Sequence, residues 1–176
     1  MGFHSFLQKN RIPLESVMAK SWNKKIFKDI DAKVNQASKD LAEERGACPD
    51  AAEYGYQERF SNKTAIAPTA SISIICGGAS PGVEPIAANS YTHKTLSGSF
   101  NVKNRYLEEI LESHGKNDDE TWSSITTNQG SISHLDFLTD LEKDVFKTAF
   151  ELNQNWIIEL SGDRTPFISQ AQSVNL

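Results

Sequence analysis

The stretch KTAIAPTASISIICGGASPGVEP, residues 63–85, combines residue types that can bind an anion. A short apolar run ends at Pro68, and small hydroxyl residues follow it at Thr69, Ser71 and Ser73. The pattern predicts a strand, a tight turn and a short helix over 69–76. The first amides of a helix have no partner within the helix, and the helix dipole adds partial positive charge there. Such a turn can bind a phosphate group.

Two interpretations of this turn stay open from spacing alone. Thr69 or Ser71 can cap the helix with a hydroxyl group, or the amides and hydroxyls can together bind phosphate. The turn is not a P-loop, because it contains no GxxxxGK[ST] pattern. It is expected at the carboxyl end of a strand, where α/β folds bind their ligands.

The other residues of interest form no catalytic or metal-binding pattern. Cys48 and Cys76 have neither CxxC spacing nor a nearby His cluster, so we expect free thiols and no structural zinc site. Glu84, at the corner after the glycines, is expected to make structural hydrogen bonds. Asp163 and Arg164 are expected to form a local ion pair.

The bulk composition limits the classes of partner. The 176 residues carry a net charge of −5 at pH 7, with 38% hydrophobic and 23% charged residues, which is typical of one globular domain. No apolar run approaches the ~20 residues of a membrane-spanning helix, and the start has no signal-peptide pattern. Lys and Arg nowhere cluster without acids between them. We therefore expect a cytoplasmic protein that binds neither membrane nor nucleic acid.

Helices dominate the elements that must position the turn. Apolar residues recur every three to four positions over 13–45, with Pro13 in the first turn and Gly46 as the stop. Further helices are expected over 104–113, over 118–126, from the capping box Thr139–Glu142 toward Glu151, and over 153–161. Extended chain is expected over 63–67, in parts of 89–103 with a break at Ser97-Gly98, and in the tail 166–176, whereas 47–62 is expected to be a loop.

The strands are few, and helices separate them. No hairpin is expected to join any two, so the strands would need parallel neighbours supplied by helical crossovers. Too few are present to close a sheet, and the pattern stops at Val174-Asn175-Leu176 without a cap or polar tail. The predicted class is α/β, mostly helical with a few short strands. Residues 1–176 are expected to be one piece of a larger assembly, with no complete second domain.

The motifs AIAPTASIS, SPGVEP and THKTLSGSF, in this order and spacing, resemble the large catalytic subunit of class I aerobic ribonucleotide reductase. The resemblance runs from MGFHSFLQKNRIPLESVMAKSWNKKIF to GDRTPFISQAQSVNL and so covers essentially the whole chain. It implies that the chain is part of the second half-barrel of a ten-stranded α/β barrel with a central finger loop. It also implies that the substrate diphosphate binds to Pro68, Thr69, Ala70, Ser71, Ile72 and Ser73. Thr69 and Ser71 would donate through hydroxyl and amide, and Ala70 and Ile72 through the amide alone.

The resemblance places the reacting groups of the family outside this sequence. The family reduces ribonucleoside diphosphates to deoxyribonucleotides by radical chemistry, which needs a thiyl-radical cysteine with neighbouring Asn and Glu, and a pair of adjacent tyrosines. The sequence has no Asn-x-Cys-x-Glu pattern and no Tyr-Tyr pair. We therefore expect no catalytic residue, metal or cofactor in this segment, and no activity from the isolated chain. The radical would come from a metal-containing small subunit, and nucleotide effectors would bind elsewhere.

Three interpretations of the whole chain follow. The main one is a segment of the large subunit of a ribonucleoside-diphosphate reductase, whose partners are the substrate, the remainder of the large subunit, the small subunit and further copies in a homo-oligomer. The second is a non-catalytic helical interaction module. The third is one half of a split reductase that is active only with a second chain.

Overall fold

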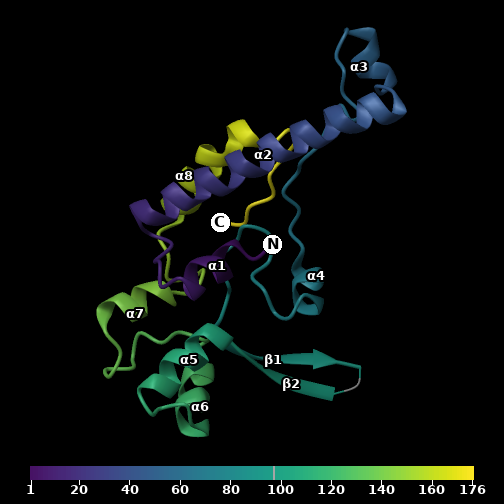
Figure 1. Ribbon diagram of the computed structural model, residues 1–176. Helices are drawn as coiled ribbons and strands as arrows, with labels where there is room; N and C mark the ends of the chain where they lie inside the picture. Colours follow the sequence, from purple (N-terminus) through teal and green to yellow (C-terminus); the bar gives the residue numbers. More distant parts are fainter. Residues whose placement is uncertain (97) are drawn as a thin grey trace.

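The computed structural model describes residues 1–96 and 98–176. Helices outweigh strands, as expected (Figure 1). The helices are α1 (Phe3–Lys9), α2 (Val17–Arg45), α3 (Pro49–Glu53), α4 (Ala70–Ile75), α5 (Arg105–Ser113), α6 (Asp119–Thr127), α7 (Asp140–Val145) and α8 (Gln154–Arg164). The two strands are β1 (Ser90–Thr95) and β2 (Gly98–Lys103), and a short 3-10 helix, η1 (Thr165–Phe167), follows α8. Within these residues no helix is both long and apolar enough to cross a membrane.

The long helix α2 begins later than the expected residue 13. The Ser16 hydroxyl oxygen accepts the Ala19 N–H at 3.1 Å and donates to the Pro13 carbonyl at 2.6 Å. Pro13 therefore lies in the turn before the helix, and Ser16 is the capping residue. The expected end is confirmed, because Gly46 follows the last turn with a φ of 81°, in the left-handed region that glycine enters without steric cost.

The hydrophobic core divides into two clusters. The first lies between α1, the N-terminal half of α2 and α8, which runs beside α2 in Figure 1. Its buried members are Phe3, Leu7, Ile12, Leu14, Ala19, Phe27, Val83, Leu152 and Leu160. The second lies between α5, α6, α7 and the turns that join them, with the buried members Leu107, Ile110, Leu111, Trp122, Ile125, Ile132, Leu135, Leu138, Val145 and Phe146.

The strands β1 and β2 form an antiparallel hairpin that extends away from both clusters (Figure 1). The register pairs Tyr91 with Val102 and His93 with Phe100. The expectation that no hairpin joins two strands is therefore wrong. Gly98, which begins β2, has a φ of 138°, a value that side-chain-bearing residues rarely adopt, so the predicted break is the reversal of the chain. Ser97, the other residue of that predicted break, lies outside the described residues.

The expected extended segments 63–67 and 166–176 meet in a short parallel pairing. The bridge joins Ile66 to Gln172, with the Ile66 N–H donating to Ala171 at 3.1 Å and the Ser173 N–H donating to Ile66 at 2.9 Å. The prediction of a parallel neighbour reached through helices is confirmed for this pair. Neither segment forms a regular strand along its whole length, because the ladder is limited to a single bridge.

The helix starts that rest on local caps are confirmed. The Asn104 side chain accepts the Tyr106 N–H at 3.1 Å at the start of α5, and the Asp118 carboxylate accepts the Thr121 N–H at 2.7 Å at the start of α6. Thr139 forms the predicted capping box at the start of α7. These signals act within one helical turn, so sequence alone contains them.

Two predictions about where helices lie are wrong. The helix from Thr139 ends at Val145 rather than near Glu151. The Glu151 carboxylate instead accepts both the N–H and the hydroxyl of Thr148 at 2.8 Å, which closes a separate turn. The segment 47–62, expected to be a loop, contains the short helix α3, which lies beyond the far end of α2 in Figure 1.

Candidate functional site

Thr69 joins the extended segment to α4. Its backbone lies in the left-handed region, at φ 52° and ψ 27°, which is uncommon for a β-branched residue. Its hydroxyl oxygen accepts the Gly82 N–H at 2.7 Å and makes no capping bond to α4. Ser71 lies within the helix, at its second position. Capping by the Thr69 hydroxyl, one of the two interpretations of this turn, is therefore wrong.

Gly82 fits closely against the end of the extended segment. It has a φ of 49°, and a Cβ atom there would lie 2.9 Å from the Ala67 carbonyl oxygen. A side chain at this position would therefore meet backbone, which cannot move aside easily. The close approach puts the Gly82 amide within reach of Thr69, so these two residues together shape the turn. Gly82 belongs to the motif SPGVEP, and nothing in that motif indicated its contact with Thr69.

The first amides of α4 are free. The first hydrogen bond of the helix runs from the Ser73 N–H to the Thr69 carbonyl, at 2.9 Å. Among the described residues, the N–H groups of Ala70, Ser71 and Ile72 have no hydrogen-bond acceptor, as expected for the first turn of a helix. All three residues are exposed. Three unbonded backbone donors therefore lie in exposed residues within one helical turn.

The six residues predicted to contact substrate divide into two groups. Pro68, Ala70, Ser71 and Ile72 are exposed, and Thr69 is half-buried. Ser73 is buried, and its hydroxyl donates to the Ala70 carbonyl at 2.7 Å. The Ser73 side chain therefore stabilises the turn from inside, and the outward donors are amides together with the Ser71 hydroxyl.

The far end of α4 is closed by residues from another part of the chain. The Gly77 carbonyl accepts a hydrogen bond from the guanidinium of Arg105, the first residue of α5. Gly77 lies just beyond the C-cap Cys76 of α4, and a cation near the C-terminal end of a helix is favourable for the helix dipole. Arg105 thus connects the base of the hairpin to the short helix, and nothing in the sequence pattern indicated this contact.

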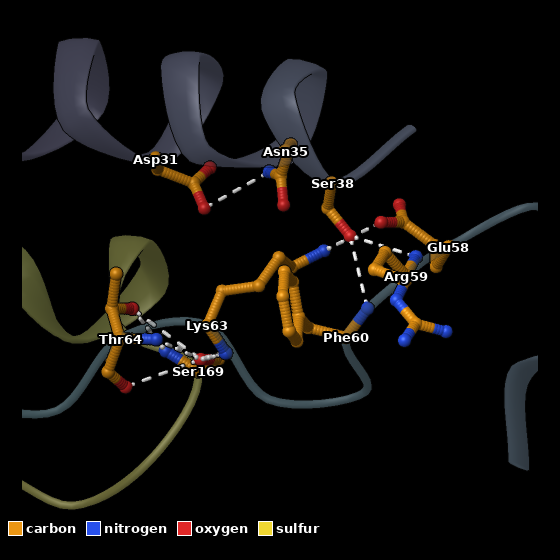
Figure 2. A network of polar contacts seen from close by, with 9 residues as sticks. All are labelled: Asp31, Asn35, Ser38, Glu58, Arg59, Phe60, Lys63, Thr64 and Ser169. Atoms are coloured by element: carbon orange, nitrogen blue, oxygen red, sulfur yellow. Dashed lines mark hydrogen bonds and ion pairs between the residues drawn. The ribbon is translucent and has the colours of Figure 1, made fainter. Parts of the chain in front are cut away.

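A polar network ties the segment that enters the turn to α2 (Figure 2). The buried Ser38 hydroxyl accepts the N–H groups of Arg59 and Phe60 at 3.1 and 3.2 Å. The Lys63 ammonium lies 3.3 Å from the Glu58 carboxylate. Hydrogen bonding by the Ser38 side chain, and then the interaction with Lys63, hold the pKa of Glu58 below its usual value.

Ser169 fixes the start of the extended segment. Its hydroxyl oxygen accepts the N–H groups of Lys63 and Thr64 at 2.9 and 2.8 Å, and its own N–H donates to the Thr64 hydroxyl at 3.0 Å (Figure 2). The candidate turn is therefore supported by α2 and by the C-terminal segment, which are far apart in sequence.

A cavity of about 560 Å³ lies beside the extended segment and reaches the turn. Its lining includes Thr69, Gly82 and every residue of the segment 63–67. Much of the remaining lining consists of apolar residues of α1 and α2: Phe3, Phe6, Ile26, Phe27 and Ile30. This cavity is mainly apolar, which distinguishes it from the exposed amides at the start of α4.

The guanidinium of Arg164, at the end of α8, is buried and contacts both α2 and the C-terminal segment. Arg164 is fully buried; its Nη1 donates to the Asn23 side chain at 3.0 Å and its Nε to Gln172 at 2.7 Å. None of the ion pairs found in the described residues includes Arg164, and burial lowers its pKa to about 10. The predicted local pair with Asp163 is wrong, because the Asp163 carboxylate lies 3.0 Å from the Lys24 ammonium instead.

The remaining candidates take structural positions. Glu84 accepts the backbone and side-chain N–H groups of Asn175 at 3.2 and 2.8 Å, which confirms its predicted hydrogen-bonding role. Cys48 and Cys76 are free thiols. In the described part of the chain, no group of three or more His, Cys, Asp or Glu side chains is arranged to hold a metal ion.

Known proteins similar to this chain match it along its whole length. A family model described as the barrel domain of ribonucleotide reductase matches residues 1–58 and 50–176. The chain is 47% identical over 180 residues to a ribonucleoside-diphosphate reductase large subunit of Invertebrate iridescent virus 6 and 44% identical over 179 residues to that of Invertebrate iridescent virus 3. Both alignments cover 100% of this chain but only 19% and 28% of the relatives.

A solved structure gives the same result for the fold. The alpha subunit of the class Id ribonucleotide reductase of Actinobacillus ureae superposes with a TM-score of 0.91 at 40% identity. The match covers 100% of this chain and 32% of that subunit. The chain belongs to the ribonucleotide reductase large-subunit family and corresponds to part of its barrel domain.

Proposed function

We propose that this chain is a segment of a ribonucleoside-diphosphate reductase large subunit and that its turn 68–73 binds the diphosphate of the substrate. The observation that carries the proposal is the set of three amides at the start of α4, which have no acceptor among the described residues and belong to exposed residues. The Thr69 hydroxyl supports this assignment because it is bonded to Gly82 and leaves these amides free.

The chemistry of the turn suits a diphosphate. The amides of Ala70, Ser71 and Ile72 are successive donors, and the Ser71 hydroxyl adds a fourth on the same exposed turn. A hydrogen bond to a charged group contributes about 1.5–3 kcal/mol, whereas ordering the turn and the ligand opposes binding. With four donors and no cation among residues 68–73, we expect millimolar affinity, on the order of −4 kcal/mol, for this chain alone.

The rest of the activity belongs to the longer protein in this proposal. The chain would form part of the second half of a ten-stranded barrel, and the remainder of the large subunit would supply the radical cysteine and the effector sites. A metal-containing small subunit would supply the radical, so this segment would hold no cofactor. The complete enzyme would be a cytoplasmic homo-oligomer of the large subunit that acts on ribonucleoside diphosphates with its small subunit.

The test is a titration of the chain with inorganic diphosphate, followed by amide chemical shifts. We expect the amides of Ala70, Ser71 and Ile72 to shift together. The Ser71→Ala variant removes one charge-assisted donor and should weaken binding by about tenfold. Ser124→Ala is the matched control: its hydroxyl donates to the Thr121 carbonyl on α6, far along the chain from the turn, and its loss should leave the affinity unchanged.

The Ile66 amide shows whether the turn is assembled during the titration. Its hydrogen bond to Ala171 forms only when the extended segment is in place, so slow exchange of this amide marks the folded state. If Ile66 is protected and the three amides of α4 do not shift, the turn does not bind diphosphate and the proposed role is wrong.

A further inference from the structure

The segment that follows α4 returns to the start of α1 (Figure 1). Ser5 and Ser80 form a reciprocal pair there: the Ser80 N–H donates to the Ser5 hydroxyl at 2.8 Å, and the Ser5 N–H donates to the Ser80 hydroxyl at 3.1 Å. The Gly2 N–H also donates to the Ser80 carbonyl, at 2.8 Å. Both serine side chains are buried, so water does not compete for these bonds. Ser80 is therefore fixed to α1 through its backbone and its side chain.

A second contact with α1 lies a few residues further along the same segment. The Ile86 N–H donates to Nδ1 of the buried His4 at 3.0 Å. Gly82 lies between the two anchored residues, in a tight turn that the Glu84 N–H closes by donating to the Pro81 carbonyl at 3.0 Å. The position of Gly82 therefore depends on the contacts that α1 makes on either side of it.

Gly82 in turn holds the side chain of Thr69. Its N–H donates to the Thr69 hydroxyl oxygen at 2.7 Å, and among the hydrogen bonds of the described residues this is the only one that the Thr69 side chain makes. The Thr69 backbone has a φ of 52°, which is uncommon for a β-branched residue and persists only where surrounding contacts hold it. The bond from Gly82 is such a contact.

A Thr69 hydroxyl released from Gly82 would have other donors within reach. A residue that caps a helix usually has an extended backbone, and its side-chain oxygen accepts the N–H of the second or third helical residue. In α4 these residues are Ser71 and Ile72, whose amides are two of the three proposed to bind diphosphate. A capping Thr69 would therefore compete with the anion for the same donors.

We propose that Ser5 is a positioning residue for the turn 68–73. Through Ser80 it holds Gly82 beside Thr69, and this keeps the Thr69 hydroxyl away from the first amides of α4. The inference rests on the proposed function of the turn and adds to it a residue of α1 that touches no ligand.

Hydrogen exchange tests the link between Ser5 and Gly82 without any ligand. In Ser5→Ala the Ser80 N–H loses its acceptor, so we expect the Gly82 amide to exchange at least about tenfold faster than in the unchanged chain. In the unchanged chain the amides of Ser80 and Gly82 should have similar protection factors, because a single opening of this segment releases both.

Two measurements guard this comparison. Ser113→Ala is the matched control, because it also removes a serine hydroxyl from a helix, but that hydroxyl donates to the Ile110 carbonyl within α5. It should leave exchange at Gly82 unchanged. Slow exchange of the Ile66 amide, which is bonded to Ala171, shows that each variant is folded.

A titration with inorganic diphosphate tests the consequence for the turn. We expect Ser5→Ala to weaken binding by about three- to tenfold, because the released Thr69 hydroxyl then caps α4 in competition with the anion. In a Thr69→Val background the same substitution should leave the affinity unchanged, because valine has no hydroxyl that can cap the helix. A general structural role of Ser5 would weaken binding equally in both backgrounds.

Three results would overturn the proposal. The first is unchanged exchange at Gly82 in a folded Ser5→Ala variant. The second is a protected Ser80 amide beside an unprotected Gly82 amide in the unchanged chain, which decides the question even where Ser5→Ala does not fold. The third is an equal loss of affinity with and without the Thr69 hydroxyl. A folded, unchanged chain that does not bind diphosphate refutes the proposed function, whereas the exchange data still decide whether Ser5 positions Gly82.

Discussion

His4 should make this protein sensitive to mild acid. The side chain lies in α1 with 1% of its surface exposed, and its Nδ1 accepts the Ile86 N–H at 3.0 Å. An acceptor at Nδ1 requires a neutral ring with the proton on Nε2. Burial lowers the pKa of His4 from 6.5 to about 4, because the imidazolium form would lose its hydration without gaining a counter-ion.

The magnitude follows from the difference between the folded and unfolded pKa values. At pH 7 the ring is mostly neutral in both states, so it affects stability little. As the pH falls below 6.5, the unfolded chain binds a proton at His4 and the folded chain does not, so the free energy of unfolding decreases. Each pH unit corresponds to about 1.4 kcal/mol, so at pH 5 the loss is about 2 kcal/mol.

Urea unfolding at pH 7, 6 and 5 measures this effect, and His4→Asn is the matched control. The Asn side-chain oxygen can accept the Ile86 N–H but does not titrate, so the variant should lose about 2 kcal/mol less between pH 7 and 5 than the unchanged chain. The carboxylates with lowered pKa values, Glu58, Asp118 and Glu142, contribute stability that is lost only below about pH 4.5, outside this window. Equal losses in both proteins would refute the assignment to His4.

Two further pairs of substitutions test a buried polar contact and a close backbone contact. Arg164→Met leaves the buried Asn23 side-chain oxygen unpaired, which should cost about 1–3 kcal/mol of stability in urea unfolding. The double variant with Asn23→Ala should lose less stability than the sum of the two single variants, with a coupling energy of about 0.5–3 kcal/mol. Strict additivity would show that the two side chains do not interact. Gly130→Ala places a Cβ 2.4 Å from Ala88 at a φ of 82°, whereas Gly115→Ala, at a φ of 66°, meets nothing within 4 Å. Both variants should lose about 1–2 kcal/mol of stability because alanine strains the left-handed backbone, and Gly130→Ala should lose about 1–3 kcal/mol more because its Cβ meets Ala88. Equal urea midpoints for the two variants would contradict the crowding at Gly130.

The parts of the fold that sequence predicted correctly depend on neighbours within one turn. Asn104, Asp118 and the Thr139–Glu142 box each cap the helix that follows directly, and Gly46 ends α2. The predicted start of α2 was wrong because both Pro13 and Ser16 suit a helix start. The Ser16 hydroxyl caps the helix, and Pro13 lies in the turn before it. Local patterns therefore predicted the helices better than their lengths.

The incorrect predictions depend on partners far along the chain. Asp163 and Arg164 are adjacent in sequence, yet their nearest polar partners both come from α2: the Asp163 carboxylate pairs with Lys24, and the Arg164 guanidinium donates to Asn23. Nothing near residue 163 indicates that α8 packs against the N-terminal half of α2. The hairpin was missed for a different reason: its strands are neighbours in sequence, but their residues suit parallel and antiparallel pairing alike, and only the reversal at Gly98 decides between them.

The candidate turn shows why a hydroxyl residue beside a helix start is ambiguous in sequence. A capping hydroxyl accepts the second or third amide of the helix, and those are the donors that an anion would use, so capping and anion binding at one helix start exclude each other in part. Thr69 stands at the capping position but adopts a left-handed backbone, and its hydroxyl accepts the amide of Gly82 instead. Gly82 can approach this closely only because it has no Cβ to meet the Ala67 carbonyl. The availability of three amides at the start of α4 therefore depends on a glycine thirteen residues further along the chain, which no inspection of residues 68–73 alone could reveal.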